Sequence, residues 1–110
     1  MNRLENKVAV ITGASSGIGN SIARLFAAEG AKVVMFARRE KELNDTAAEI
    51  TANGGVAVAC PGDVSVQADV ERALNTAIEK FGKVDIVVND AGMVRYNGGV
   101  AVVTDDECME

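Results

Sequence analysis

The sequence contains no histidine or tryptophan, one proline, one tyrosine and two cysteines among its 110 residues. Without histidine, the commonest metal ligand and the usual proton shuttle are absent, so we expect no metal site. Cys60 and Cys108 form no CxxC pair, which indicates two free thiols in a reduced, cytoplasmic compartment. No apolar run is long enough to span a bilayer, and the polar start does not resemble a secretion signal.

The charge balance is acidic, with a formal net charge of −5 at neutral pH. An acidic chain is a poor partner for nucleic acid, so we expect neither nucleic-acid nor membrane binding. The hydrophobic fraction of 48% is typical of a globular protein. No linker or repeat interrupts the pattern, and we therefore expect a single domain over residues 1–110.

Apolar runs alternate with amphipathic segments along the whole chain. The runs predict strands at residues 7–12, 32–37, 56–60 and 84–89. Between them, the helical period predicts helices from 17 to 29, 41 to 53 and 66 to 81, ended by Gly30, Gly54 and Gly82. In the first helix we expect Ile18, Ile22, Leu25 and Phe26 to share the inner face. In the third helix we expect Ser65 to be the N-cap, and we expect the inner face to carry Val70, Ala73, Leu74, Ala77, Ile78 and Phe81.

The strands read as continuous apolar runs, which is typical of a parallel sheet covered by helices on both faces. We therefore predict an α/β fold, a Rossmann-like doubly wound parallel sheet of order 3-2-1-4. Pro61 and Gly62 are expected to break the third strand. The sheet is predicted to be truncated after the fourth strand, which leaves a free apolar edge and a marginally stable chain. Ligands of such sheets lie at the carboxyl ends of the strands.

Three glycines follow the first strand in the pattern GxxxGxG. Gly13 permits a sharp exit from the strand, Gly17 lets a diphosphate approach the backbone, and Gly19 lets the helix pack close to the sheet. The helix N-terminus offers N–H groups to an anion, and Ser15 and Ser16 add hydroxyl donors. A tight turn capped by serine would use the same residues, but the flanking strand and helix favour nucleotide binding. No Gly-Lys-Ser/Thr follows, which excludes a P-loop.

The segment TGASSGIG at 12–19 resembles the cofactor motif of the short-chain dehydrogenase/reductase family, as do Asp63-Val64 after the third strand and DIVVNDAG at 85–92. The resemblance covers nearly all of the chain. It implies a bound NAD(H) or NADP(H) and hydride transfer between nicotinamide and a small carbonyl or alcohol substrate. The expected cofactor-binding residues are Gly13, Ser15, Ser16, Gly17, Ile18, Gly19, Arg38, Arg39, Asp63, Val64, Asn89, Ala91 and Gly92.

Arg38 and Arg39 stand at the end of the second strand, where an NAD-selective site usually has a carboxylate. Two cations at the start of a helix are unfavourable beside the positive end of its dipole, and an anion bound between them would offset this. The 2′-phosphate of NADP(H) is such an anion. This predicts NADP(H), mainly through Arg38, with NAD less favoured. The alternative is that the two arginines are solvated and balance the negative charges of Glu40 and Glu42.

In the family, the residue matching Asp63 binds the adenine amino group and the residue matching Val64 lies along the ring. The alternative for Asp63 is an acidic turn residue before the Ser65 cap. Asn89 matches the first Asn of the family's NNAG segment, but Asp90 stands where the second Asn is usual. That change adds a negative charge near the diphosphate.

Ala91 and Gly92 match the family, but its catalytic residues are not expected in this chain. The family uses a Tyr with a Lys four residues later, a Ser and an Asn, whereas Val100 stands four residues after Tyr96. Residues 104–107 read as a capping box that opens another helix. We therefore expect no catalytic residue here, and a chain that forms part of a longer homo-oligomeric oxidoreductase.

Two other hypotheses remain open. The chain is alternatively a non-catalytic dinucleotide-binding module or truncated pseudo-enzyme. A methyltransferase using S-adenosylmethionine is a third class, but such a site usually has an acidic residue where this chain has Arg38. The sequence does not identify the substrate.

Overall fold

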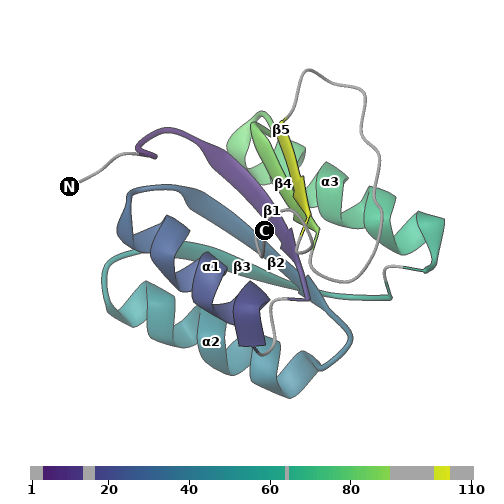
Figure 1. The fold of residues 1–110 in the computed structure, drawn as a ribbon, viewed down its shortest axis with the longest axis horizontal. Coiled ribbons are helices and arrows are strands. Elements are labelled where there is room, and N and C mark those ends of the chain that lie inside the picture. The colour runs from purple at the N-terminus through teal and green to yellow at the C-terminus, as the bar shows by residue number, and fades with distance from the viewer. Residues whose placement is uncertain (1–3, 14–16, 64, 90–100, 105–110) are drawn as a thin grey trace.

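The computed structural model of the chain describes residues 4–13, 17–63, 65–89 and 101–104, without the side chains of residues 18, 89 and 101–104. Its elements in chain order (Figure 1) are β1 (Val8–Thr12), α1 (Gly17–Ala28), β2 (Lys32–Ala37), α2 (Glu40–Ala52), β3 (Val56–Pro61), α3 (Gln67–Phe81), β4 (Ile86–Asn89) and β5 (Ala101–Thr104). Among the helices described, none combines the length and apolar character needed to cross a membrane.

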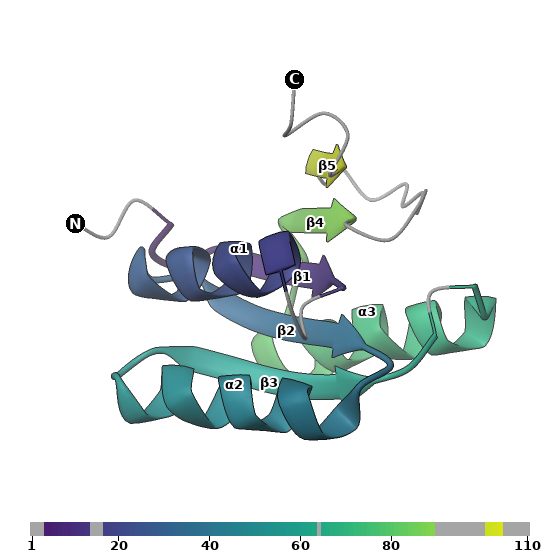
Figure 2. The ribbon, with the colours of Figure 1, turned by 60° about the horizontal axis from the view of Figure 1, so that its bottom comes forward.

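All described strands are parallel and form one sheet in the order β3-β2-β1-β4-β5. Val10 in β1 lies opposite Val34 in β2 and Val87 in β4, so the central strands are in register. Helices α1 and α2 cover one face and α3 covers the other (Figure 2). The predicted α/β doubly wound sheet and its order 3-2-1-4 are confirmed, because each helix links two parallel strands through a crossover.

The fifth strand corrects the prediction that the sheet is truncated after the fourth. Residues 101–104 pair with all of β4, from Ile86 opposite Ala101 to Asn89 opposite Thr104. The segment AVVT combines apolar and β-branched residues, which suits a strand, but four residues give a weak periodic signal. The edge of β4 that was expected to be free is therefore paired. The helix predicted over 104–107 falls mainly on residues outside the described ranges.

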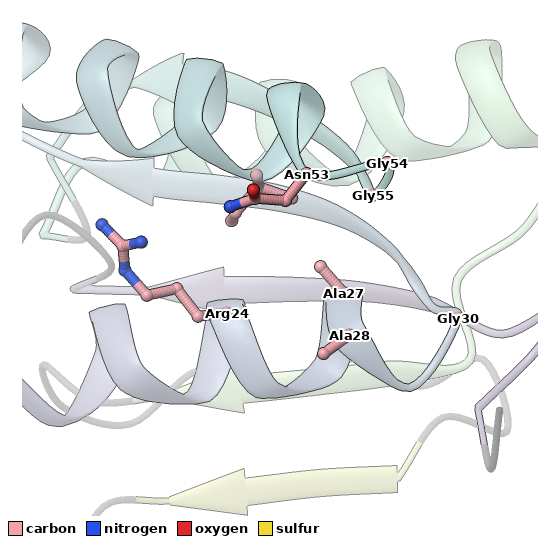
Figure 3. A pocket seen from close by; sticks show the side chains of 8 residues that line it. Arg24, Ala27, Ala28, Gly30, Asn53, Gly54 and Gly55 are labelled. Carbon is pink, nitrogen blue, oxygen red and sulfur yellow. The ribbon is translucent and has the colours of Figure 1, made fainter. Parts of the chain in front are cut away.

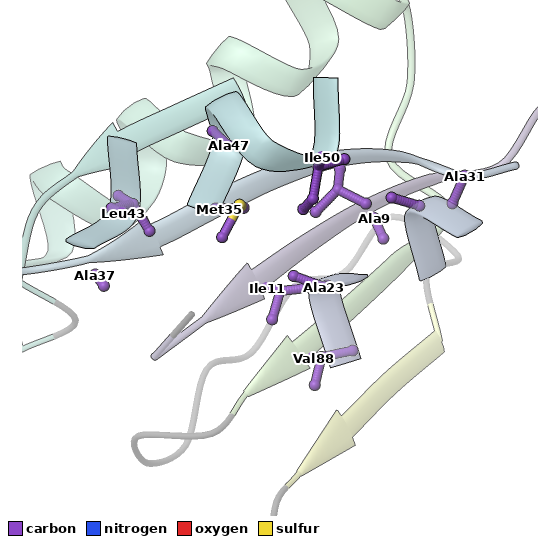
Figure 4. Close-up of a cluster of buried hydrophobic side chains, with 12 residues drawn as sticks. Ala9, Ile11, Ala23, Ala31, Met35, Ala37, Leu43, Ala47, Ile50 and Val88 are labelled. Atoms are coloured by element: carbon purple, nitrogen blue, oxygen red, sulfur yellow. The ribbon is translucent and has the colours of Figure 1, made fainter. Parts of the chain in front are cut away.

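The core beneath α1 and α2 is built from small residues on α1 and larger ones on α2 and the sheet. Figure 4 shows Ala23 beside Ile11 and near Val88, and Met35 between Leu43 and Ile50. Leu25 was predicted to face inward with Ile22 and Phe26, but it is 58% exposed. The buried stripe of α1 runs through Ala23 and Ala27, because alanines let the helix approach the sheet closely.

The opposite face of the sheet packs on α3 through Ala73, Leu74 and Ala77. Ile78, predicted on this inner face, is 40% exposed, since it lies at the border of the stripe that Leu74 and Ala77 define. Cys60 is a buried free thiol beneath α3, and Cys108 lies outside the described residues.

Two predicted boundaries around α3 are wrong by one residue. Pro61 ends β3 rather than breaking it, because β3 is an edge strand and its proline needs no ladder partner for a missing N–H. The N-cap of α3 is Val66, not Ser65. The hydroxyl of Ser65 instead donates to Oδ1 of Asp63 at 2.7 Å.

Candidate functional site

The exit from β1 passes directly against the start of α1. Gly13 and Gly17 have φ values of 64° and 61°, in the left-handed region that favours glycine. A Cβ at Gly19 would lie 2.3 Å from the carbonyl oxygen of Gly13 and 3.0 Å from that of Thr12. The close helix packing predicted for Gly19 is therefore confirmed. Ser15 and Ser16 and the side chain of Ile18 lie outside the described part of the chain.

Gly17 differs from Gly19 in having space around it. A Cβ added at Gly17 would meet no atom of the described residues within 4 Å. The first residue of α1 therefore presents its main chain to open space at the carboxyl end of β1. The amino end of a helix carries unpaired N–H groups and a partial positive charge, so this surface suits an anion.

Thr12 connects the two strands that flank the switch point of the sheet. Its side chain is buried, and its Oγ1 donates to the carbonyl oxygen of Val88 in β4 at 3.3 Å. The backbone of Asn89 ends β4 beside this contact, whereas Asp90, Ala91 and Gly92 lie outside the described residues. The carboxyl ends of β1 and β4 are thus held together at the switch point, which is the usual ligand position in open α/β sheets.

Arg38 and Arg39 follow β2 and are both exposed. Arg39 is the N-cap residue of α2, and within the described ranges no side chain supplies a capping hydrogen bond there. The described residues also form no ion pair with either arginine, although Glu40 and Glu42 stand in the first turn of the same helix. Within the described ranges, neither guanidinium group is therefore held in an ion pair.

Asp63 lies at the carboxyl end of β3, beyond Pro61 and Gly62. Its Oδ1 accepts hydrogen bonds from the backbone N–H and the hydroxyl of Ser65, at 2.9 and 2.7 Å. These two bonds lower the pKa of Asp63; partial burial opposes them, and the positive charge of Arg38 lowers the pKa further. The carboxylate is therefore ionised at neutral pH, in the field of Arg38. Val64 lies outside the described residues.

The structure brings the glycines, Arg38 and Asp63 to one edge of the sheet, where the strands of Figure 2 end. Sequence reasoning missed two residues that contact this edge. Asp69 and Arg72, near the start of α3, bond to the main chain of Asp63 and Pro61. Their opposite charges, three residues apart at a helix start, are the only signal that could have found them.

A pocket of about 310 Å³ lies at the opposite edge, between the carboxyl ends of α1 and α2 (Figure 3). Arg24 and Asn53 are its polar side chains, and Ala27, Ala28 and Ile50 supply apolar surface. None of the predicted cofactor residues contributes to it. The candidate site is therefore the open edge beyond β1, β2 and β3.

Comparison with known proteins gives a family and several relatives. A family model described as short chain dehydrogenase matches residues 7–110. An uncharacterized oxidoreductase of Listeria monocytogenes is 41% identical over 104 residues, which is 94% of this chain and 42% of that protein. A mitochondrial borneol dehydrogenase of Lavandula x intermedia is 46% identical over 93 residues, or 84% of this chain and 34% of that protein.

Among solved structures, a 7α-hydroxysteroid dehydrogenase complexed with NADH and 7-oxo glycochenodeoxycholic acid superposes with a TM-score of 0.79 at 44% identity. The match covers 83% of this chain and 36% of that one. The chain thus spans about two fifths of the length of the relatives that it matches. With the parallel sheet and the glycine-rich exit from β1, these matches show that the chain belongs to the short-chain dehydrogenase family.

Proposed function

We propose that this chain is the NADP(H)-binding part of a short-chain oxidoreductase that transfers hydride between nicotinamide and a carbonyl or alcohol group of a small molecule. The observation that carries the proposal is the close approach of Gly19 to the Gly13 carbonyl, beside the open surface at Gly17. A turn without a ligand does not require both features, whereas a diphosphate seated on a helix N-terminus does. The bound dinucleotide would supply the hydride chemistry.

The diphosphate lies, in this proposal, against the start of α1. Gly13 and Gly17 allow the main chain to curve around it, and the N–H groups of the first turn donate to its oxygens. Ser15 and Ser16 add the hydroxyl donors predicted from the sequence. The ends of β1 and β4, joined through Thr12, lie beneath the nicotinamide ribose, and Asn89, Ala91 and Gly92 follow β4.

The 2′-phosphate lies at Arg38, with Arg39 beside it at the start of α2. Both side chains are exposed and neither has a carboxylate partner in the described part of the chain, which supports an anion there. An arginine fork matches the geometry of a phosphate. Because a structurally similar dehydrogenase was solved with NADH, the choice between the two cofactors needs a direct measurement.

The adenine lies between these anchors and the end of β3, where Asp63 stands. Ser65 engages Oδ1 of this carboxylate, and the described residues direct no hydrogen bond to Oδ2. A carboxylate held ionised only accepts hydrogen bonds, so Oδ2 suits the exocyclic amino group of adenine. Val64 follows along the ring.

Titration with NADPH and NADH, followed by the fluorescence of the reduced nicotinamide, tests the proposal. We expect saturable binding of both and tighter binding of NADPH. Arg38→Asp should reverse the preference, because it removes the guanidinium and adds a charge that repels the 2′-phosphate. Lys80→Asp, at the far end of α3, makes the same change in net charge and should leave the preference unchanged.

Absence of saturable NADPH binding to folded protein, even at millimolar concentration, would overturn the proposal as a whole. Retention of the NADPH-to-NADH ratio in Arg38→Asp would overturn only the assignment of the 2′-phosphate.

A further inference from the structure

Two side chains of α3 hold the main chain that carries Asp63. Oδ2 of Asp69 accepts the backbone N–H of Asp63 at 3.0 Å, and Nη2 of Arg72 donates to the carbonyl oxygen of Pro61. Oδ1 of Asp69 lies 3.9 Å from Nη2 of Arg72, so the two side chains also face each other. We call Asp69 and Arg72 the α3 pair.

The hydrogen bond of Asp69 is directed away from its own helix. An acidic side chain at the third position of a helix commonly bonds to the N-cap N–H. Here the N-cap is Val66, whose N–H donates instead to the carbonyl oxygen of Asp63 at 3.0 Å. Asp69 therefore bonds to the loop that precedes α3, and both polar groups of the Asp63 main chain are engaged.

Gly62 lies between the two residues that the α3 pair holds, in a confined position. A Cβ there would lie 2.6 Å from Cε2 of Phe36 and 2.9 Å from Nη2 of Arg72. Its N–H also donates to the carbonyl oxygen of Ala37 at 2.9 Å. Gly62 is thus packed between β2 and the Arg72 guanidinium, with no room for a side chain unless one of these neighbours shifts.

We infer that Asp69 and Arg72 are positioning residues for the adenine end of the cofactor. They hold the backbone at 61 and 63, so that the carboxylate of Asp63, oriented by Ser65, faces the adenine amino group. This inference rests on the proposed function, because Asp63 can accept a hydrogen bond from the adenine amino group only when a dinucleotide is bound. The side chains of Asp69 and Arg72 are 30% and 54% exposed, and exposed ion pairs contribute little to folding stability. Their effect is therefore on the loop rather than on the fold.

The test compares binding of NADPH with binding of its hypoxanthine analogue, which carries a carbonyl oxygen in place of the adenine amino group. The unmodified chain should prefer NADPH by about tenfold or more, as expected for a hydrogen bond to a charged group. Asp69→Ala and Arg72→Ala should each lose most of this preference. Asp69→Asn, which keeps an acceptor oxygen for the Asp63 N–H, should keep it. Glu71→Ala, an exposed acidic residue of the same helix, is the matched control.

If Asp69 and Arg72 had a merely structural role, their substitution would lower the affinity for both ligands equally and leave the ratio of the two affinities unchanged. An unchanged ratio in Asp69→Ala overturns the inference, and if that variant does not fold, an unchanged ratio in Arg72→Ala does so. If the unmodified chain binds both ligands equally, the adenine contact of Asp63 is wrong and the inference falls with it. If it binds neither, the proposed function itself has failed.

Discussion

Gly19 lies so close to Gly13 that a Cβ on Gly19 would stand 2.3 Å from the Gly13 carbonyl oxygen. This close approach of the first and third glycines of the loop brings the start of α1 onto the end of β1. A Cβ on Gly17 would meet no atom of the described residues within 4 Å, so two glycines only two residues apart differ sharply in how closely they are packed.

Gly19→Ala should destabilise the chain, because its methyl group meets main-chain atoms that cannot move aside as a flexible side chain would. We expect a loss of about 1–3 kcal/mol in the free energy of unfolding, the usual cost of overpacking. Urea unfolding followed by circular dichroism measures it. Ser21→Ala, an exposed change in the same helix, is the control. An unchanged urea midpoint in Gly19→Ala would contradict the close packing.

Gly17→Ala and Gly82→Ala form a matched pair. Both glycines have positive φ, 61° and 85°, and a Cβ at either meets no atom of the described residues within 4 Å. Both substitutions should therefore cost about 1–2 kcal/mol of stability through backbone strain. Only Gly17→Ala should also weaken NADPH binding, since Gly82 caps the far end of α3. Equal affinities in the two variants would argue against a diphosphate at Gly17.

Asp85 should make the stability of the chain depend on pH. Burial raises the pKa of its carboxyl, but the hydrogen bond from the Val8 N–H and the charges of Lys83 and Lys7 outweigh this and lower the pKa overall. Because the pKa is lowered in the folded state, the carboxylate stabilises the fold at pH values above its ordinary pKa of 3.8. That stabilisation is lost as the pH falls through the lower pKa of the folded state.

The free energy of unfolding of the unmodified chain should therefore exceed that of Asp85→Asn near neutral pH, and the two should converge below about pH 4. Chemical denaturation at a series of pH values measures the difference. Asp45→Asn removes an exposed ion pair with Lys41 and should have a smaller effect at every pH. A gap between the chain and Asp85→Asn that widens toward acid would show the sign to be wrong.

Asn20 and Thr46 should be energetically coupled across α1 and α2. Nδ2 of Asn20 donates to Oγ1 of Thr46 at 2.8 Å, and the side chain of Thr46 is only 5% exposed. A double-mutant cycle with Asn20→Ala and Thr46→Val should give a coupling of about 0.5–1.5 kcal/mol. The exposed pair of Arg24 and Glu49 should give less. If the effects of the Asn20 and Thr46 substitutions are additive, this hydrogen bond does not stabilise the packing of α1 against α2.

Much of the fold could be predicted from local patterns. The apolar runs at β1 to β4 and the glycines after each helix mark element bounds to within a residue or two, and their alternation specifies a parallel sheet. Predictions failed where a pattern was short or a residue stood at the border of a buried face. The four residues of β5, and Leu25 and Ile78, are of this kind, since burial at a border depends on how a helix is rotated against its sheet.

At the candidate site, the sequence by itself determined which chemistry-bearing residues end the strands: the glycines after β1, the arginines after β2 and Asp63 after β3. Those positions follow from strand order, which a repeated strand–helix pattern specifies. Only the tertiary structure decided that Asp69 and Arg72 hold the main chain around Asp63, and that Ser65 orients its carboxylate rather than capping α3. Such contacts depend on the angle at which a loop leaves its strand and on packing against Phe36, and no local sequence pattern encodes either.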